Sequence, residues 1–338
     1  MGNLITSVAS YTGKQADFQE TFVLALAKTP LLAQLGFRIE QDIQSSKTFY
    51  KTGRLQKITK KSVDCNTGDT ATGVAISSVV LSVTQMEAEL SQCKAPFEAS
   101  IYEAALKKGY DVYNLEGTQI QTLLLEVFGN AVATDLYRQI FLNDTTLTNS
   151  DYTAYDGIFK TLKAGALAGD GTVRVAAVIS DTDINQTNIL ATLDTYVDAQ
   201  NSVLKYNYTP DQKRMYVTDP IYRALEQKYT TLGNLESSKT ELINGIATLK
   251  FRGIPVVNLL TIGDYINVDF ATGSPATAND NRIILTNPLN HIIGTDMMTD
   301  TTSAEFWYER KDKKNYCRLN YRAGYKYIDG VENVIGGF

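Results

Sequence analysis

Two long extended runs in the first hundred residues constrain the fold more than any other feature of the sequence. Residues 48–62 carry five basic residues and no acidic one, and residues 74–86 alternate with a period of two, with β-branched residues dominating. Between them, residues 64–69 are rich in Asp, Asn and Gly, which favour turns. The pattern predicts one long β-hairpin whose arms reach about 40–50 Å at roughly 3.3 Å per residue.

A hairpin of this length is difficult to bury within one small domain. An isolated two-stranded ribbon is marginally stable in water, and its open edges invite pairing with another chain. We therefore expect a second protein chain to cover the hairpin. The residues expected to make this contact lie near the tip and on the second arm: Lys57, Lys60, Lys61, Val79 and Leu81.

Composition is ordinary for a globular protein. The chain has 338 residues, of which 43% are hydrophobic and 20% charged, enough for two or three subdomains with a sizeable core. The formal net charge of -5 gives no general case for nucleic-acid binding. No apolar run is long enough to span a membrane, no secretion signal is visible, and three cysteines without CxxC spacing favour reduced thiols in a cytosol.

The strongest helix signal covers residues 118–142. Its apolar residues recur at steps of three and four: Ile120, Leu123, Leu124, Val127, Phe128, Val132, Leu136, Ile140 and Phe141. At 1.5 Å per residue this predicts a rod of about 37 Å. The helix is long enough to act as a spine for the domain around it.

The second half of the chain mixes strand and helix signals without strict alternation, which predicts an α+β fold rather than a doubly wound sheet. A helix is expected over residues 221–229, with Asp219 as its N-cap and Pro220 in its first turn. The glycine-rich residues 164–171 are expected to form a loose surface turn. Strands are expected over residues 173–179, 215–217, 247–251, 254–260, 282–286, 305–310 and 316–327.

The sequence offers no convincing catalytic, cofactor-binding or metal site. His291 is the only histidine, and its apolar context favours a packed or hydrogen-bonded imidazole over a catalytic base. The glycine-rich passage lacks the Lys-Ser/Thr pair of a phosphate loop. Glu305 and Glu309 share one face of a predicted strand, but the basic residues that follow them favour a solvated, ion-paired turn. We expect no enzyme activity, no cofactor and no metal.

Taken in order, these elements resemble the major capsid proteins of tailed bacteriophages, which have the Hong Kong 97 type of fold. Residues 213–225 are similar to the family's strand that leads into a helix, and residues 249–257 are similar to its "G-x-P-V" passage. The resemblance implies an N-terminal arm over residues 1–44, an extended-loop hairpin over 45–92 and a peripheral domain with the spine helix over 93–180. It further implies an axial domain over 181–290 and closing strands over 291–338 that return to the peripheral domain.

The resemblance implies a structural coat protein that assembles in the host cytoplasm into pentamers, hexamers and an icosahedral-type virion shell. Packaged DNA would lie against the inner face without sequence specificity, and no membrane would be involved. About forty residues precede the hairpin, fewer than in relatives that carry their own scaffold, so a separate scaffold protein or none is implied. Portal or cement proteins are further expected partners, and crosslinking between subunits is not predicted.

Two other functions stay open at this stage. One is a bacterial nanocompartment shell of the encapsulin kind, which has the same fold and encloses a cargo enzyme. Residues alone do not separate it from a phage capsid. The other, more distant alternative is a soluble hydrolase that uses carboxylates such as Glu305.

Overall fold

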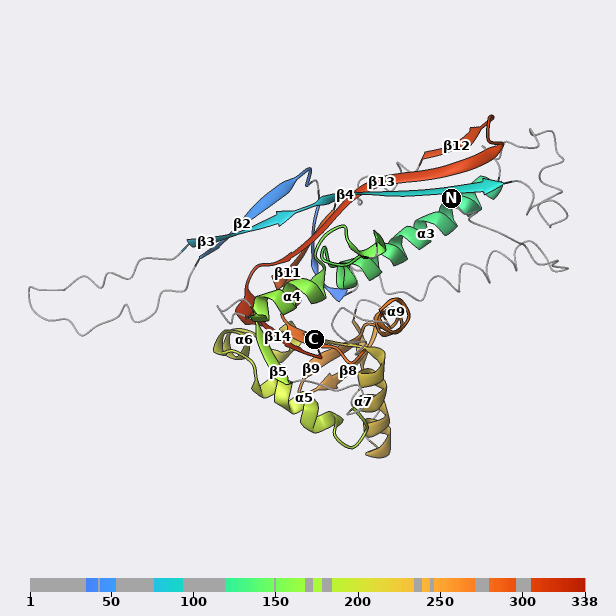
Figure 1. Ribbon diagram of the computed structural model, residues 1–338. Helices are drawn as coiled ribbons and strands as arrows, with labels where there is room; N and C mark the ends of the chain where they lie inside the picture. The colour runs from blue at the N-terminus through green and yellow to red at the C-terminus, as the bar shows by residue number, and fades with distance from the viewer. Residues whose placement is uncertain are drawn as a thin grey trace, which may run out of the picture.

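The computed structural model describes residues 35–41, 43–52, 76–93, 119–148, 150–167, 173–177, 184–233, 239–243, 246–270, 280–295 and 305–337. Helices and strands are mixed along the chain, which confirms the predicted α+β class. Within the described residues the strands form two larger sheets and a two-stranded ribbon that projects from the body of the molecule (Figure 1). Most of the expected N-terminal arm lies outside the described residues.

The first sheet is built on one long strand, β13 (Lys314–Tyr327). β4 (Thr84–Cys93) runs antiparallel along one side of β13. β12 (Glu305–Glu309) and β11 (His291–Thr295) pair with β13 as well, and β1 (Arg38–Glu40) extends the sheet by pairing in parallel with β11. Fully buried and partly exposed residues alternate along most of β13, so one face of this sheet belongs to the core and the other is open.

The predicted spine helix is present as α3 (Gln119–Leu142), which lies beside this sheet (Figure 1). Phe128, Val132 and Phe141 share one hydrophobic core with Leu319 and Tyr321 of β13. The described apolar residues of the predicted stripe are all buried: Leu124, Val127, Phe128, Val132, Leu136, Ile140 and Phe141. The apolar stripe therefore marks the core face of the helix correctly.

The expected glycine-rich surface turn begins inside a helix instead. α4 (Ile158–Leu167) includes Gly165, which is buried. A Cβ at Gly165 would lie 2.3 Å from the Tyr327 hydroxyl oxygen, so a larger residue here would have to displace the Tyr327 side chain at the end of β13. The prediction of a loose turn is wrong for residues 164–167, and residues 168–172 lie outside the described residues.

The second sheet has the strand order β5-β14-β10-β6-β9-β8-β7. Its strands are β5 (Arg174–Ala177), β14 (Asn333–Gly336), β10 (Ile283–Thr286), β6 (Arg214–Val217), β9 (Ile254–Asn258), β8 (Ile246–Phe251) and β7 (Lys239–Ile243). β9, β10 and β14 are buried along their whole length, as is usual for strands covered on both faces. The central part of this sheet is therefore closed to solvent.

Two strands from segments expected in the peripheral domain lie in the second sheet. β5 belongs to the segment 93–180 and β14 to the segment 291–338, both expected in the peripheral domain, yet both strands lie in the second sheet. The domain boundaries stay a prediction. The strands expected from residue 173 onward are all present, and their described ends lie within two residues of the expected ones; residues 178 and 179 lie outside the described residues.

Helices flank the second sheet (Figure 1). They are α5 (Ile189–Asp198), α6 (Ser202–Asn207), α7 (Asp219–Thr231) and α9 (Ile262–Asp269). The expected N-cap of α7 is wrong by one residue, because Thr218 is the N-cap and Asp219 is the first residue inside the helix. The Asp219 carboxylate accepts a hydrogen bond from Asn258 Nδ2 at 2.8 Å, so it binds a neighbouring side chain of β9. Pro220 lies in the first turn, as predicted.

Candidate subunit-contact surface

The two extended runs pair at the root of the hairpin, as the sequence predicts. β2 (Ser46–Thr52) and β3 (Ile76–Ser82) are antiparallel, with Ser46 opposite Ser82 and Thr52 opposite Ile76. The ribbon that they form projects from the body, away from the turn that joins β12 to β13 (Figure 1). Lys57, Lys60 and Lys61 lie outside the described residues, so their contacts stay a prediction.

One face of the hairpin, called here the inner face, lies on the hairpin's own subunit. Leu81 is fully buried in a small cluster with Ile43 and Ile292. Phe49 packs against the same cluster, and Val79 stands opposite Phe49 and is half-buried. Leu81 therefore finds its contacts within its own subunit, and a contact with a second chain has to use other residues of the hairpin.

The opposite face, called here the outer face, carries no charged side chain among the residues of β2 and β3 that the structure describes. Its described residues are Ser46, Thr48, Tyr50, Thr52, Ile76, Ser78, Val80 and Ser82. Tyr50 is 76% exposed, Ile76 67% and Val80 48%. Large apolar side chains grouped on an uncharged exposed ribbon are typical of a surface that another protein covers.

Charged side chains hold the root of β2 beside the first sheet. The Glu40 carboxylate pairs with Arg38 at 2.5 Å and with Lys47. The hydrogen bond from Lys47 is the main reason why the pKa of Glu40 is below its usual value, and Arg38 adds to the effect. Both cations also lie over the Phe49 ring, at 5.3 Å for Arg38 and 5.6 Å for Lys47.

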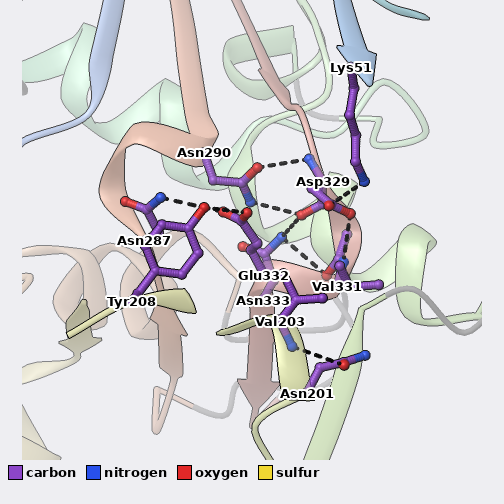
Figure 2. Close-up of polar contacts among 11 residues, drawn as sticks. Lys51, Asn201, Val203, Tyr208, Asn287, Asn290, Asp329, Val331, Glu332 and Asn333 are labelled. Carbon is purple, nitrogen blue, oxygen red and sulfur yellow. Dashed lines mark hydrogen bonds and ion pairs between the residues drawn. The ribbon is translucent and has the colours of Figure 1, made fainter. Parts of the chain in front are cut away.

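Further along the inner face, Lys51 connects the hairpin to a polar junction (Figure 2). The junction is the group Lys51, Tyr208, Asn287, Asn290, Asp329, Glu332 and Asn333. Lys51 pairs with the Asp329 carboxylate, which also accepts the backbone N–H of Val331 at 3.2 Å. Asn290 and Asp329 exchange two hydrogen bonds of 2.8 Å, from Asn290 Nδ2 to the Asp329 carbonyl and from the Asp329 N–H to Asn290 Oδ1.

The deeper half of the junction reaches the second sheet. Glu332 is 8% exposed and accepts hydrogen bonds from the Tyr208 hydroxyl at 2.6 Å and from Asn287 Nδ2 at 3.4 Å. Burial raises the pKa of Glu332, although these two hydrogen bonds oppose the shift. Asn333, the first residue of β14, donates to the Asp329 carbonyl at 2.9 Å. The junction therefore links the hairpin, the end of β13 and the second sheet through partnered polar groups.

His291 is packed and neutral, which confirms the prediction from its sequence context. It is 1% exposed, and burial lowers its pKa to about 3. Its Nδ1 lies 2.6 Å from the Tyr325 hydroxyl and its Nε2 lies 3.0 Å from the Thr286 hydroxyl. Because the Thr286 hydroxyl donates to Asn333 at 2.8 Å, the proton is assigned to Nε2 and Nδ1 accepts from Tyr325. The imidazole has no room to act on a substrate.

The candidate carboxylate pair lies on β12. Glu305 is exposed, and Glu309 accepts the backbone N–H of Lys311 at 3.2 Å. Trp307, between them on the same face, is half-buried and stacks on Tyr316 with 5.4 Å between ring centres. The described residues bring no three metal-binding side chains together, and they contain no helix long and apolar enough to cross a membrane.

Comparisons with known proteins give a clear result for the fold. No family model and no curated protein matches the sequence. The capsid of Myoviridae phage XM1 matches with a TM-score of 0.54 and 14% identity, over 99% of this chain and 98% of that one. The capsid of cyanophage P-SCSP1u and the procapsid of satellite phage P4 match with TM-scores of 0.52 and 0.51, each at 12% identity over 98% of this chain and 92% of the other. The chain therefore has the fold of tailed-phage capsid proteins, as its sequence resemblance implies.

Proposed function

We propose that the chain is the major capsid protein of a tailed phage, copies of which assemble into a closed shell around the phage DNA. One observation carries the proposal beyond the fold: the ribbon of β2 and β3 projects from its subunit, and the described residues of its outer face include the exposed Tyr50, Ile76 and Val80 and no charged residue. A single subunit leaves these side chains in water. A second copy that covered them would remove this apolar surface from solvent.

The hairpin makes the contact between copies in this proposal. Its inner face is occupied by its own subunit, so the outer face and the predicted tip with Lys57, Lys60 and Lys61 are left for a neighbour. Val79 is on the inner face but is only half-buried, so it stays a candidate at the edge of the contact. In a closed symmetric shell the same contact repeats at every copy. A modest binding free energy at one interface is therefore multiplied by the number of interfaces in the shell.

The proposed assembly consists of pentamers and hexamers in an icosahedral-type shell, formed in the host cytoplasm and located in the virion. DNA would contact the inner face without sequence specificity. A separate scaffold, a portal and cement proteins are further proposed partners. The solved procapsid of satellite phage P4 includes a size determination protein, which illustrates that a shell of this fold can be assembled with an accessory protein.

The proposed role is structural rather than catalytic. Its support is the state of the groups that an enzyme would use: the imidazole of His291 is buried and neutral, and Glu305 and Glu309 lie on an edge strand beside an exposed turn. None of the described features favours the nanocompartment shell over the capsid.

The test is expression of the full chain, followed by light scattering and electron microscopy across a range of protein and salt concentrations. We expect closed shells or capsomers. A compact monomer under all conditions would overturn the proposal. Shells purified from the natural host separate the two shell functions, because a phage capsid holds DNA and a nanocompartment holds a protein cargo.

A further inference from the structure

The hairpin leaves the first sheet by crossing over its open face. The last pair that β4 makes with β13 joins Thr84 to Ala323. The preceding residues, Ser82 and Val83, lie directly over Gly324: a Cβ added at Gly324 would be 2.2 Å from the Ser82 carbonyl oxygen and 3.1 Å from Val83 Cα. The backbone of the hairpin therefore rests on the backbone of the sheet at this point.

A second glycine widens the crossing point. Gly294 of β11 stands opposite Gly324, and residues that stand opposite each other in an antiparallel pair share a face. A Cβ added at Gly294 would be 2.8 Å from Val83 Cγ1 and 2.9 Å from Leu81 Cδ2. We call the pair Gly294 and Gly324 the glycine notch. The two positions differ in what they face, since Gly324 meets backbone and Gly294 meets the ends of side chains.

Other contacts hold the hairpin in the direction that the notch allows. The Val83 N–H donates to the Ser45 carbonyl at 3.0 Å, which ties the two arms together where they cross the sheet. Leu81 packs with Ile43 and Ile292 on the same face. Lys51 reaches Asp329 further out along the arm. The hairpin is thus fixed to its own subunit at successive points along its inner face.

We infer that the glycine notch sets the direction in which the hairpin leaves the subunit, and that Gly324 is the main positioning residue. The inference rests on the proposed function, because the direction matters only if the outer face has to meet a second copy. Gly324→Ala forces the backbone at Ser82 and Val83 to move, since no rotamer change can relieve a clash with a carbonyl oxygen. A small displacement at the root is then magnified along the arm.

The direction can be measured on the unassembled subunit. Spin labels on Ser78→Cys of β3 and Val268→Cys of α9, both exposed positions, report the distance between hairpin and body when the three native cysteines are replaced by alanine. Gly324→Ala should displace the main distance peak by more than its width in the unsubstituted chain. Gly294→Ala should displace it much less, because Val83 and Leu81 can change rotamer. Gly129→Ala, on α3 with nothing within 4 Å of the added Cβ, is the matched control.

Assembly provides the second measurement. Gly324→Ala should give at least roughly tenfold fewer closed shells than Gly129→Ala, while its circular dichroism stays unchanged. If Gly324→Ala yields no soluble protein, Gly294→Val tests the same displacement through side chains, and its combination with Val83→Ala should restore the distance peak. An unchanged peak in Gly324→Ala, or unchanged shells with a displaced peak, would overturn the inference. If the unsubstituted chain forms no shells, the proposed function fails, and the distance measurement still shows whether the notch sets the direction.

Discussion

The body of the subunit and the hairpin satisfy their apolar groups in different ways. In the body, α3 and the central strands of the second sheet bury their large side chains within one chain, and β9, β10 and β14 have no exposed residue. The hairpin buries only its inner face and leaves Tyr50 and Ile76 largely exposed. If the chain assembles as proposed, folding should depend on the body and assembly on the hairpin, so substitutions in the two regions should have separable effects.

The largest effect is expected in the body. Leu124→Asp or Phe128→Asp places an unpaired carboxylate where the side chain is at most 1% exposed, at a cost of several kcal/mol, comparable to the stability of a whole domain. We expect little soluble protein from either variant. Expression yield and thermal melting are the measurements, with the exposed Gly129→Ala as a control that should melt at or slightly above the temperature of the unsubstituted chain. Normal yield and melting of both Asp variants would show that this face of α3 is not essential core.

The outer face of the hairpin should show the opposite behaviour. The double variant Tyr50→Asp, Ile76→Asp adds two carboxylates to an exposed ribbon, so folding should change by no more than about 0.5 kcal/mol. A neighbouring copy would have to bury both charges, and we expect shells to be lost while circular dichroism is retained. The conservative pair Tyr50→Phe, Ile76→Val should assemble. Shells of normal yield from the Asp variant would locate the contact elsewhere.

The predicted tip gives a finer test of the same comparison. Lys57→Glu, Lys60→Glu, Lys61→Glu reverses three charges far from any core of the subunit, so the fold should be kept. If the tip rests on an acidic surface of a neighbour, each reversal costs on the order of 1 kcal/mol or more at every interface. We expect assembly to stall at monomers or capsomers at low salt, as seen by electron microscopy. Replacing the same lysines by arginine keeps the charge and should give shells; equal shell yields from both triple variants would remove the tip from the mechanism.

The smallest effect is expected at the junction between the two regions. Burial raises the pKa of Glu332, so the folded state favours the protonated carboxyl. Protonation therefore stabilises the folded state fully at pH values below the pKa that Glu332 has in the unfolded chain. This stabilisation is lost as the pH rises through the pKa that Glu332 has in the folded chain. Glu332→Gln cannot titrate. From mildly acidic to neutral pH, the free energy of unfolding of the natural chain should fall relative to this variant by about 1.4 kcal/mol for each unit by which the pKa is raised. Melting of both proteins across this range measures the difference, and parallel pH profiles would contradict the assignment.

The sequence predicts best where a pattern is long and one-sided. The spine helix covers the described residues 119–142 of the expected range 118–142 and ends as predicted, because its apolar stripe repeats over more than six turns. Alternation also predicts the pairing of β2 with β3. Strands β11 and β14 are not predicted from the sequence, since each has only two consecutive branched apolar residues followed by a glycine, which is too short a run to indicate a strand.

The candidate site was harder to predict, because contacts between distant segments decide it. Alternation shows that the hairpin has two faces, but only the approach of Ile43 and Ile292 shows which face is covered by the same subunit. Leu81 was therefore expected at a contact with a neighbour, although its own subunit buries it. The glycine notch gave no sequence signal either, since Gly294 and Gly324 are thirty residues apart and acquire a common role only when β11 and β13 pair.

The position of β14 also determines how early in its synthesis the chain can complete the second sheet. Asn333–Gly336 lies between β5 and β10 inside the second sheet, and Asn333 and Glu332 complete the polar junction under the hairpin. While the ribosome is still translating the preceding residues, the nascent chain lacks the strand between β5 and β10. It also lacks the contacts of Glu332 and Asn333 in the polar junction under the hairpin. Translation therefore has to pass Gly336 before a copy can acquire its final shape, and a chain released earlier would lack the strand that holds the sheet together. The second sheet and the polar junction thus depend on the same late strand, so neither can be complete before β14 is synthesised.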